Sequence, residues 1–334
     1  MAKIRVGFIG VGGIAQGHIS RLAALDDVEI VAIADPNEES VTKSRERHVE
    51  QLADVAAYSD YRDLLERSRP EAVVICTPHT QHCAQALDSL DAGAHVLLEK
   101  PMVCNVPDAR KILSKIDQTG KVFGLAYQRH TSADFRYIRT KIMSGEVGAV
   151  QSINAIQQQD WKRLTIGTWR QVPELSGGGQ INDSGSHLLD VILWATGLAP
   201  EYVSAFIDNK GTPVDINSSV NVKFLGGATA TLNIVGDAPK WYEDVTIWCE
   251  SGAFYVRNGG QFTEQLADGT FHTPEADPTV AISDISTNFI RAIQGTEEIA
   301  APAICGLRTI ELTEAAWQSG AAGGALTAVN RSAV

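Results

Sequence analysis

The sequence is poor in the residues that build disulfide frameworks and metal sites. Its 334 residues include five cysteines, an odd number, and no two of them form a C-x-x-C pair. They are Cys76, Cys83, Cys104, Cys249 and Cys305. Cysteines scattered in this way argue against a disulfide scaffold and against a zinc site, so we expect no bound metal.

Long apolar runs and an excess of positive charge are also missing. No apolar run reaches the roughly 18 residues of a membrane-spanning helix, so no membrane partner is expected. Lysine and arginine number 28 against 40 aspartate and glutamate residues, a net charge of -12 at pH 7. Because negative charge repels nucleic acid, we expect no nucleic-acid partner. The chain starts without an apolar signal stretch, which predicts a cytoplasmic location.

The chain does contain enough apolar residues, 44%, to bury a large core, and its length favours two domains. Residues 1–126 alternate short apolar runs with amphipathic stretches. This pattern is typical of βαβ units and predicts an α/β domain whose parallel sheet is covered by helices on both faces. The expected strands are Ile4–Ile9, Val28–Ala34, Ala72–Cys76, His95–Leu98 and Val122–Ala126, and the expected helices are Gly12–Leu25, Glu38–Leu52, Gln81–Ala92 and Pro107–Thr119.

Residues 127–334 show period-two alternation instead, which predicts a strand-rich domain with an antiparallel or mixed sheet. Gly226-Gly227 is expected to form a hairpin turn between two of its strands. The last helices are candidates for packing back on the first domain. The expected strands are Ala149–Ile156, Glu201–Asp208, Ser219–Leu225, Ala228–Val235 and Asp244–Cys249, and the expected helices are Ala133–Met143, Ser184–Ala195, Ile282–Gln294 and Ala303–Gly320.

A glycine motif links the first expected strand to the first expected helix. Residues 10–15 read G-V-G-G-I-A and match the G-x-G-x-x-A fingerprint of dinucleotide binding. Gly10 permits the tight turn, and Gly12 lets backbone amides approach a pyrophosphate at the helix N-terminus. A purely structural turn is the alternative, but the strand, the helix and the following strand are all in register for a cofactor site.

Asp35 ends the second expected strand, where a carboxylate can accept hydrogen bonds from both ribose hydroxyls of an adenosine. A phosphate at the same place would meet like charge, so the sequence favours NAD over NADP. Asp35-Pro36 is also typical of a helix-entry turn, and Asp35 can serve both roles.

Two further segments carry the residue types that hydride chemistry needs. Lys100 follows the expected strand His95–Leu98 and precedes a proline, at the edge of the sheet where open α/β folds bind ligands. Asp183 and His187 lie in a segment with the sequence S-G-G-G-Q-I-N-D-S-G-S-H-L-L-D. If a helix begins at residue 183 or 184, Asp183, His187 and Asp190 share one face.

Oxidation of a secondary alcohol requires a base that takes the hydroxyl proton, and the imidazole of His187 suits this task. Lys100 would hold the substrate oxygen and Asp183 would orient the substrate. A surface lysine and a capped helix with a structural histidine are the alternatives. The D-x-x-x-H pair has no third ligand at a suitable spacing, so a metal remains unexpected.

This ordered set of motifs resembles the Gfo/Idh/MocA oxidoreductases, the family of glucose–fructose oxidoreductase and inositol dehydrogenase. The resemblance rests on residues 10–15, the segment C-T-P-H-T-Q-H at 76–82, the Glu99-Lys100-Pro101 motif and residues 177–187. It implies an N-terminal Rossmann domain followed by an α/β domain with a large open, mainly antiparallel sheet. It also implies that Lys100 is the catalytic lysine, that His187 transfers the proton, that Asp183 is the aspartate one turn earlier, and that the Lys100–Pro101 bond is cis.

The glycine motif and Asp35, together with the residues that the resemblance adds, form a set of cofactor-binding candidates in the loops after the strands of the first domain. They are Gly10, Gly12, Gly13, Ile14, Asp35, Thr77, Pro78, His79, His82, Glu99 and Lys100. Many members have asparagine where this chain has His79.

Substrate contacts are expected from a polar and aromatic stretch in the second domain. The candidates are Gln128, Arg129, Trp161 and Arg163, together with Asp183 and His187. Tryptophan faces beside arginine and glutamine donors are typical of carbohydrate sites. A loop that its tryptophans anchor to the sheet is the alternative.

We therefore expect an NAD(P)-dependent oxidoreductase that transfers a hydride between a nicotinamide and a secondary hydroxyl or ketone of a sugar, inositol or related polyol. A non-catalytic protein of the same fold that senses a dinucleotide or sugar is the alternative. The sequence does not separate oxidation from reduction as the main direction. An exposed sheet face in the second domain would need a cover, which together with the resemblance favours a homodimer or homotetramer.

Overall fold

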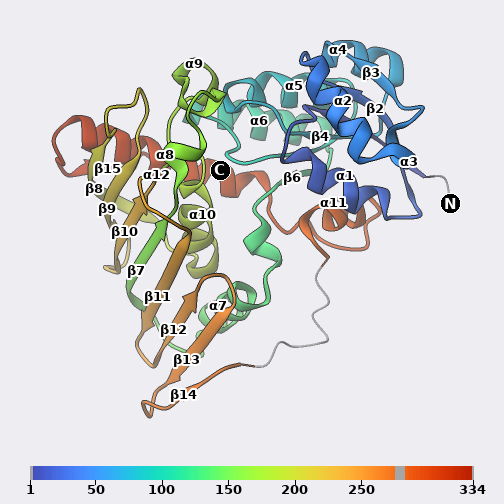
Figure 1. The fold of residues 1–334 in the computed structure, drawn as a ribbon. Coiled ribbons are helices and arrows are strands. Elements are labelled where there is room, and N and C mark those ends of the chain that lie inside the picture. Colours follow the sequence, from blue (N-terminus) through green and yellow to red (C-terminus); the bar gives the residue numbers. More distant parts are fainter. Residues whose placement is uncertain (1–2, 275–282, 333–334) are drawn as a thin grey trace. The chain divides into compact units, whose positions relative to one another are not determined.

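The computed structural model describes residues 3–274 and 283–332 and divides into two compact units (Figure 1). The first unit comprises Met1–Val103, Pro107–Gln128 and Ser283–Gly306. The second comprises Cys104–Val106, Arg129–Ile282 and Leu307–Val334. Among the described residues, no helix has both the length and the apolar character needed to cross a membrane.

The first unit is built on a six-stranded parallel sheet with strand order β3-β2-β1-β4-β5-β6. This is the strand order of a Rossmann fold, in which the chain reverses direction along the sheet between β1 and β4. The strands are β1 (Ile4–Ile9), β2 (Val28–Ala34), β3 (Ala56–Tyr58), β4 (Ala72–Ile75), β5 (His95–Leu98) and β6 (Phe123–Leu125). β1, β4 and β5 are buried almost throughout, as expected for strands covered on both faces.

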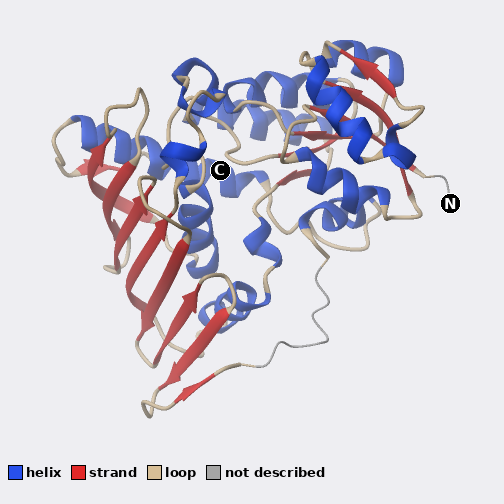
Figure 2. Cartoon of the chain, viewed as in Figure 1, coloured by secondary structure: helices blue, strands red, loops and turns tan. Residues whose placement is uncertain are grey.

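Helices surround this sheet (Figure 2). They are α1 (Ala15–Ala23), α2 (Glu38–Arg47), α3 (Val49–Leu52), α4 (Tyr61–Asp63), the π-helical turn η1 (Leu64–Ser68), the 3-10 turn η2 (His79–Gln81), α5 (His82–Asp91), α6 (Val106–Thr119) and α11 (Ile285–Ile293). The helix expected over Glu38–Leu52 is divided, because His48 leaves the helical region with φ -124° and ψ 54°. α11 comes late in the chain but packs beside α1 in this unit. The expected start of that helix at Ile282 lies outside the described residues.

The second unit carries a nine-stranded sheet with order β14-β13-β12-β11-β7-β10-β9-β8-β15. Every described pairing in it is antiparallel except that of β7 with β10. The strands are β7 (Val150–Gln158), β8 (Pro200–Asp208), β9 (Asn217–Phe224), β10 (Thr229–Val235), β11 (Tyr242–Cys249), β12 (Gly252–Arg257), β13 (Gln261–Leu266), β14 (Phe271–His272) and β15 (Thr327–Ala328). Both glycines of the turn between β9 and β10 have positive φ, 90° and 99°, which confirms the predicted hairpin.

Among the described residues, the long helices of the unit pack against one face of this sheet. Apolar side chains of α7 (Ala133–Met143), α10 (Gly185–Thr196) and the later part of α12 (Ala303–Ala321) form one core with the strands. β9 alternates buried and exposed residues accordingly. On the exposed face, polar side chains pair across strands: Ser219 donates to Asn233 at 2.7 Å and Thr231 donates to Asn221 at 3.0 Å. This part of the open face is therefore compatible with water.

Short helical turns complete the second unit. They are η3 (Gln128–Thr131), α8 (Trp161–Leu164), η4 (Trp169–Gln171) and α9 (Pro173–Ser176). The predicted fold class, a Rossmann domain followed by an α/β domain with a large, mainly antiparallel sheet, is confirmed.

Candidate active site

The loop between β1 and α1 has the geometry of a phosphate-binding turn. Gly10 has φ +84°, and a Cβ there would lie 2.9 Å from the backbone of Cys76, so only glycine fits. A Cβ at Gly12 or Gly13 would meet nothing within 4 Å, which leaves open space above the loop. Ile14 follows with 47% of its surface exposed. The loop is closely packed at Gly10, has open space at Gly12 and Gly13, and lies just before a helix N-terminus. This arrangement fits the pyrophosphate of a dinucleotide.

Asp35 is held beside this loop at the end of β2. One carboxylate oxygen accepts the backbone N–H of Val11 at 2.9 Å, and the other accepts the N–H of Asn37 at 2.9 Å. Asn37 in turn caps α2 by accepting the N–H of Glu39 at 2.9 Å. Asp35 therefore supports the helix entry and also places a carboxylate next to the glycine loop, as both interpretations of Asp35 require.

The segment after β4 points partly into the protein. His79 is 4% exposed, and His82 is fully buried. The two ring nitrogens of His82 lie 2.8 Å from the carbonyl oxygen of Pro101 and 2.9 Å from that of Thr77. Burial lowers the pKa of His82, although both carbonyls favour its charged form. His82 thus contacts backbone with both ring nitrogens, while the Thr77 hydroxyl donates to Gln85.

The Glu99-Lys100-Pro101 motif follows β5 directly, and the Lys100–Pro101 bond is cis, as expected. Glu99 is 4% exposed. Its carboxylate accepts the Nε2–H of His18 at 3.0 Å and the backbone N–H of Lys100 at 3.0 Å. Burial by itself raises the pKa of Glu99, but the hydrogen bond from His18 and the charge of Lys100 outweigh this effect and lower it. Glu99 is therefore an ionised, internally bonded carboxylate.

In the second unit, Asp183 precedes α10 instead of capping it. One oxygen of its carboxylate accepts the indole N–H of Trp161 at 2.7 Å and the guanidinium of Arg170 at 2.9 Å. Trp161 is only 4% exposed, and Arg170 also lies over the ring of Trp169 at 4.5 Å. Burial of Trp161 favours the anchored-loop interpretation of this segment, so a substrate contact by Trp161 stays a prediction. The Asp183 carboxylate links that loop to the start of the helix.

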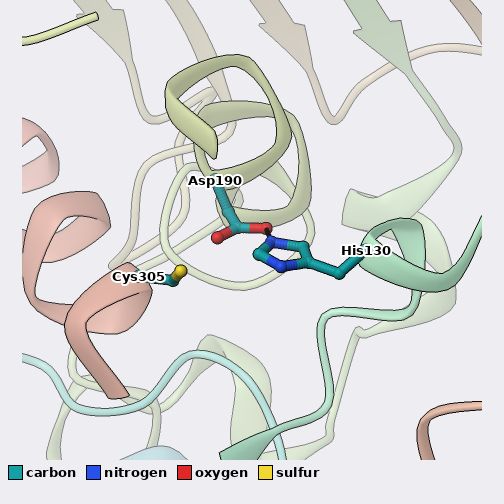
Figure 3. A group of neighbouring side chains, drawn as sticks. All are labelled: His130, Asp190 and Cys305. Atoms are coloured by element: carbon teal, nitrogen blue, oxygen red, sulfur yellow. Dashed lines mark hydrogen bonds and ion pairs between the residues drawn. The ribbon is translucent and has the colours of Figure 1, made fainter. Parts of the chain in front are cut away.

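His187 lies in the first turn of α10, where its backbone N–H donates to the carbonyl of Ser184 at 3.2 Å. Asp190, expected on the same face, is paired elsewhere: it lies 2.8 Å from Nε2 of His130 (Figure 3). Both partners are buried, and the His130 ring stacks on Trp194 with centroids 4.1 Å apart. Burial raises the pKa of Asp190 against the opposing effect of His130. The third residue drawn in Figure 3, Cys305, belongs to the first unit.

The other proposed substrate residues are engaged with neighbours. Arg129 forms an ion pair with the buried Glu243 and also reaches the carbonyl of His187 at 3.5 Å. The Arg163 side chain is 62% exposed and bonds Asp160 at 2.6 Å. Gln128 begins η3 and is partly buried. Substrate contacts by Gln128, Arg129 and Arg163 stay predictions.

The residues that hold the glycine run before α10 were not predicted from the sequence. The buried carboxylate of Asp215 accepts the N–H groups of Gly179 at 2.9 Å and Ile181 at 2.8 Å, and the indole N–H of Trp317 at 3.1 Å. Its pKa is raised by burial, in spite of these donors. The only signal in the sequence is an acidic residue inside the apolar stretch Val214-Asp215-Ile216.

Curated relatives include dehydrogenases of sugars and polyols. D-glucoside 3-dehydrogenase of Escherichia coli is 27% identical over 199 residues, which cover 59% of this chain and 55% of the relative. Myo-inositol 2-dehydrogenase of Thermotoga maritima is 23% identical over 278 residues, which cover 79% of this chain and 78% of the relative. The chain thus spans little more than half the length of the first relative.

Solved structures share the whole fold. The WlbA dehydrogenase from Bordetella pertussis, in complex with NADH and UDP-GlcNAcA, is 23% identical with a TM-score of 0.85, and 99% of each chain is covered. The model of the oxidoreductase family with an NAD-binding Rossmann fold matches residues 4–127, and that of the GFO/IDH/MocA C-terminal domain matches residues 135–255. Since models of both domains match in chain order, the chain belongs to the Gfo/Idh/MocA oxidoreductase family.

Proposed function

We propose that this chain is an NAD-dependent dehydrogenase that oxidises a secondary hydroxyl of a sugar, inositol or related polyol, or reduces the corresponding ketone. The observation that carries the proposal is the position of Lys100, which follows β5 at the carboxyl edge of a parallel sheet whose first loop fits a dinucleotide. The printed activities of the glucoside and inositol dehydrogenases support the substrate class.

The bound nicotinamide supplies the hydride acceptor or donor, and residues of this chain do the rest. His187 accepts the hydroxyl proton during oxidation and returns it during reduction. The Lys100 ammonium stabilises the negative charge that develops on the substrate oxygen. Asp183 keeps the Trp161–Arg170 loop against the start of α10 and so orients the substrate beside His187. No metal is required for these steps.

The proposal extends to cofactor choice, assembly and location. Asp35 favours NAD over NADP because a 2′-phosphate beside its carboxylate would be repelled. The open face of the second sheet favours a homodimer or homotetramer. We expect a cytoplasmic enzyme that acts on a small-molecule substrate.

The test is NADH formation across a panel of sugars, inositols and polyols, measured by absorbance. Lys100→Ala and His187→Ala should each lose roughly 100-fold or more in kcat while NAD still binds. Two exposed residues provide matched controls: Lys43→Ala on α2 and His272→Ala on β14 should keep wild-type turnover. Near-normal kinetics of His187→Ala would contradict its role. Tight sugar binding by calorimetry with no turnover on any substrate would instead favour the sensor alternative.

A further inference from the structure

Two buried histidines flank the Glu99-Lys100-Pro101 motif, and neither is explained by the chemistry above. His18 on α1 is 1% exposed, and His82 at the start of α5 is fully buried. Because Lys100 lies between Glu99 and Pro101, these histidines contact the residues on both sides of it.

On one side, a chain of hydrogen bonds runs from α11 to Lys100. The Ser286 hydroxyl lies 2.8 Å from Nδ1 of His18, Nε2 of His18 lies 3.0 Å from Glu99, and Glu99 accepts the backbone N–H of Lys100 at 3.0 Å. An ionised carboxylate only accepts hydrogen bonds, so Nε2 of His18 carries a proton. The other ring nitrogen, Nδ1, has the Ser286 hydroxyl as its partner. Every polar group in this chain has a defined role.

On the other side, His82 bridges two backbone carbonyls. Nδ1 lies 2.8 Å from the oxygen of Pro101, and Nε2 lies 2.9 Å from that of Thr77. All four ring nitrogens of the two histidines therefore contact protein atoms. This leaves His82 no ring nitrogen for a cofactor, although the resemblance placed it among the cofactor-binding residues.

We propose that His18 and His82 are positioning residues that hold the two ends of the Glu99-Lys100-Pro101 motif and thereby fix the Lys100 ammonium for the reaction. The proposal rests on the role given to Lys100 in the proposed function. Displacement of a catalytic group by about 1 Å lowers the rate on the order of 100-fold. Asparagine and glutamine differ in size by one methylene, so a residue that only fills space would not require opposite orders of the two at positions 18 and 82.

The two ring nitrogens can be tested separately, because an asparagine amide nitrogen replaces Nδ1 and a glutamine amide nitrogen replaces Nε2. His18→Gln keeps the donor to Glu99, whereas His18→Asn loses it. His82→Asn keeps the donor to Pro101, whereas His82→Gln loses it. We therefore expect opposite orders: glutamine is better than asparagine at position 18, and asparagine is better than glutamine at position 82.

The experiment measures kcat, KM and NADH affinity of the four variants with the best substrate of the panel. His18→Asn should lose about 10- to 100-fold in kcat with NADH affinity within about threefold of wild type, and His18→Gln should recover most of the loss. If asparagine and glutamine are equivalent at both positions, the proposal is wrong. If circular dichroism shows that His18→Asn does not fold, Ser286→Ala is measured in its place. Ser286→Ala should lower kcat about three- to tenfold, and an unchanged kcat would refute the proposal.

A second readout separates this proposal from the proposed function. Lysines are reductively methylated with ¹³C-formaldehyde, and the Lys100 resonance is assigned with Lys100→Arg. If wild type has no turnover on any substrate, the proposed function fails, but the titration midpoint of this resonance still reports how Lys100 is held. A midpoint changed by His18→Asn and preserved by His18→Gln supports positioning, and identical midpoints in both variants refute it.

Discussion

Replacement of Gly179 by alanine tests the packing of the glycine run before α10. A Cβ at this position would lie 2.0 Å from the carbonyl oxygen of Asp215 and 2.6 Å from its backbone nitrogen. No real Cβ contact is that short, and a backbone segment cannot swing aside as the end of a side chain does. The backbone around Gly179 and the backbone around Asp215 must therefore move apart by more than about 1 Å, which is the order of the difference between 2.0 Å and an ordinary van der Waals contact distance.

The cost follows from the bonds that join these segments. The carbonyl of Asp215 accepts the N–H of Gln180 at 2.8 Å, and its carboxylate accepts those of Gly179 and Ile181 at 2.9 and 2.8 Å. Overpacking costs about 1–3 kcal/mol, and a weakened hydrogen bond to a charged group costs about 1.5–3 kcal/mol. Since at least one bond to the buried carboxylate is lost, Gly179→Ala should lower the free energy of unfolding by about 2.5–6 kcal/mol.

Urea denaturation followed by tryptophan fluorescence measures this loss. Gly260→Ala is the matched control, because its Cβ would meet nothing within 4 Å, and it should change the free energy of unfolding by less than about 0.5 kcal/mol. Gly178→Ala should fall between them, since its Cβ meets the movable ring of Trp317 at 2.5 Å. A Gly179→Ala protein within about 1 kcal/mol of wild type would refute the reasoning.

Two further predictions concern the first unit. Asp35→Ser should weaken NADH binding and reduce the preference for NADH over NADPH by about tenfold or more, because it removes the negative charge beside the glycine loop. Fluorescence titration with both cofactors measures the two dissociation constants. An unchanged ratio of these constants would contradict the role of Asp35. Burial lowers the pKa of His95, and Nδ1 of His95 accepts the N–H of Val122 at 2.9 Å. The stability that neutral His95 contributes is therefore present above its ordinary pKa near 6.5 and is lost as the pH falls below that value. His95→Asn retains an acceptor that does not titrate, so its unfolding midpoint should fall less between pH 7.5 and about pH 5 than that of wild type; parallel losses would show that His95 does not contribute.

The sequence predicted those parts of the fold that depend on local patterns. β1, β2 and β5 have the bounds that their apolar runs indicated, and α7 matches its amphipathic pattern. β3 was not predicted, because its three residues are exposed or half-exposed and carry no apolar signal. β12–β15 were also missed; the two-residue strands β14 and β15 exist only through their pairing with β13 and β8.

The candidate site shows the same division. Gly10 and Asp35 could be recognised because each directly follows a strand of the predicted sheet, and Lys100 because it is the second residue after one. Their partners come from distant parts of the chain and leave no periodic signal. Ser286 meets His18 across 268 positions, and Asp215 meets Gly179 across 36. Only the tertiary structure brings such pairs together.

The central position of β7 in its sheet has a kinetic consequence. β7 precedes all other strands of the second sheet in the chain, yet it pairs with β10 on one side and β11 on the other. The strands on either side, β8–β10 and β11–β14, form hairpins with short loops, which close quickly. β7 thus leaves the ribosome before either of its neighbours: β10 becomes available when the first arm has been made, and β11 only after that. Completing this sheet therefore requires both later arms to dock onto its oldest strand and β15, from the end of the chain, to pair with β8.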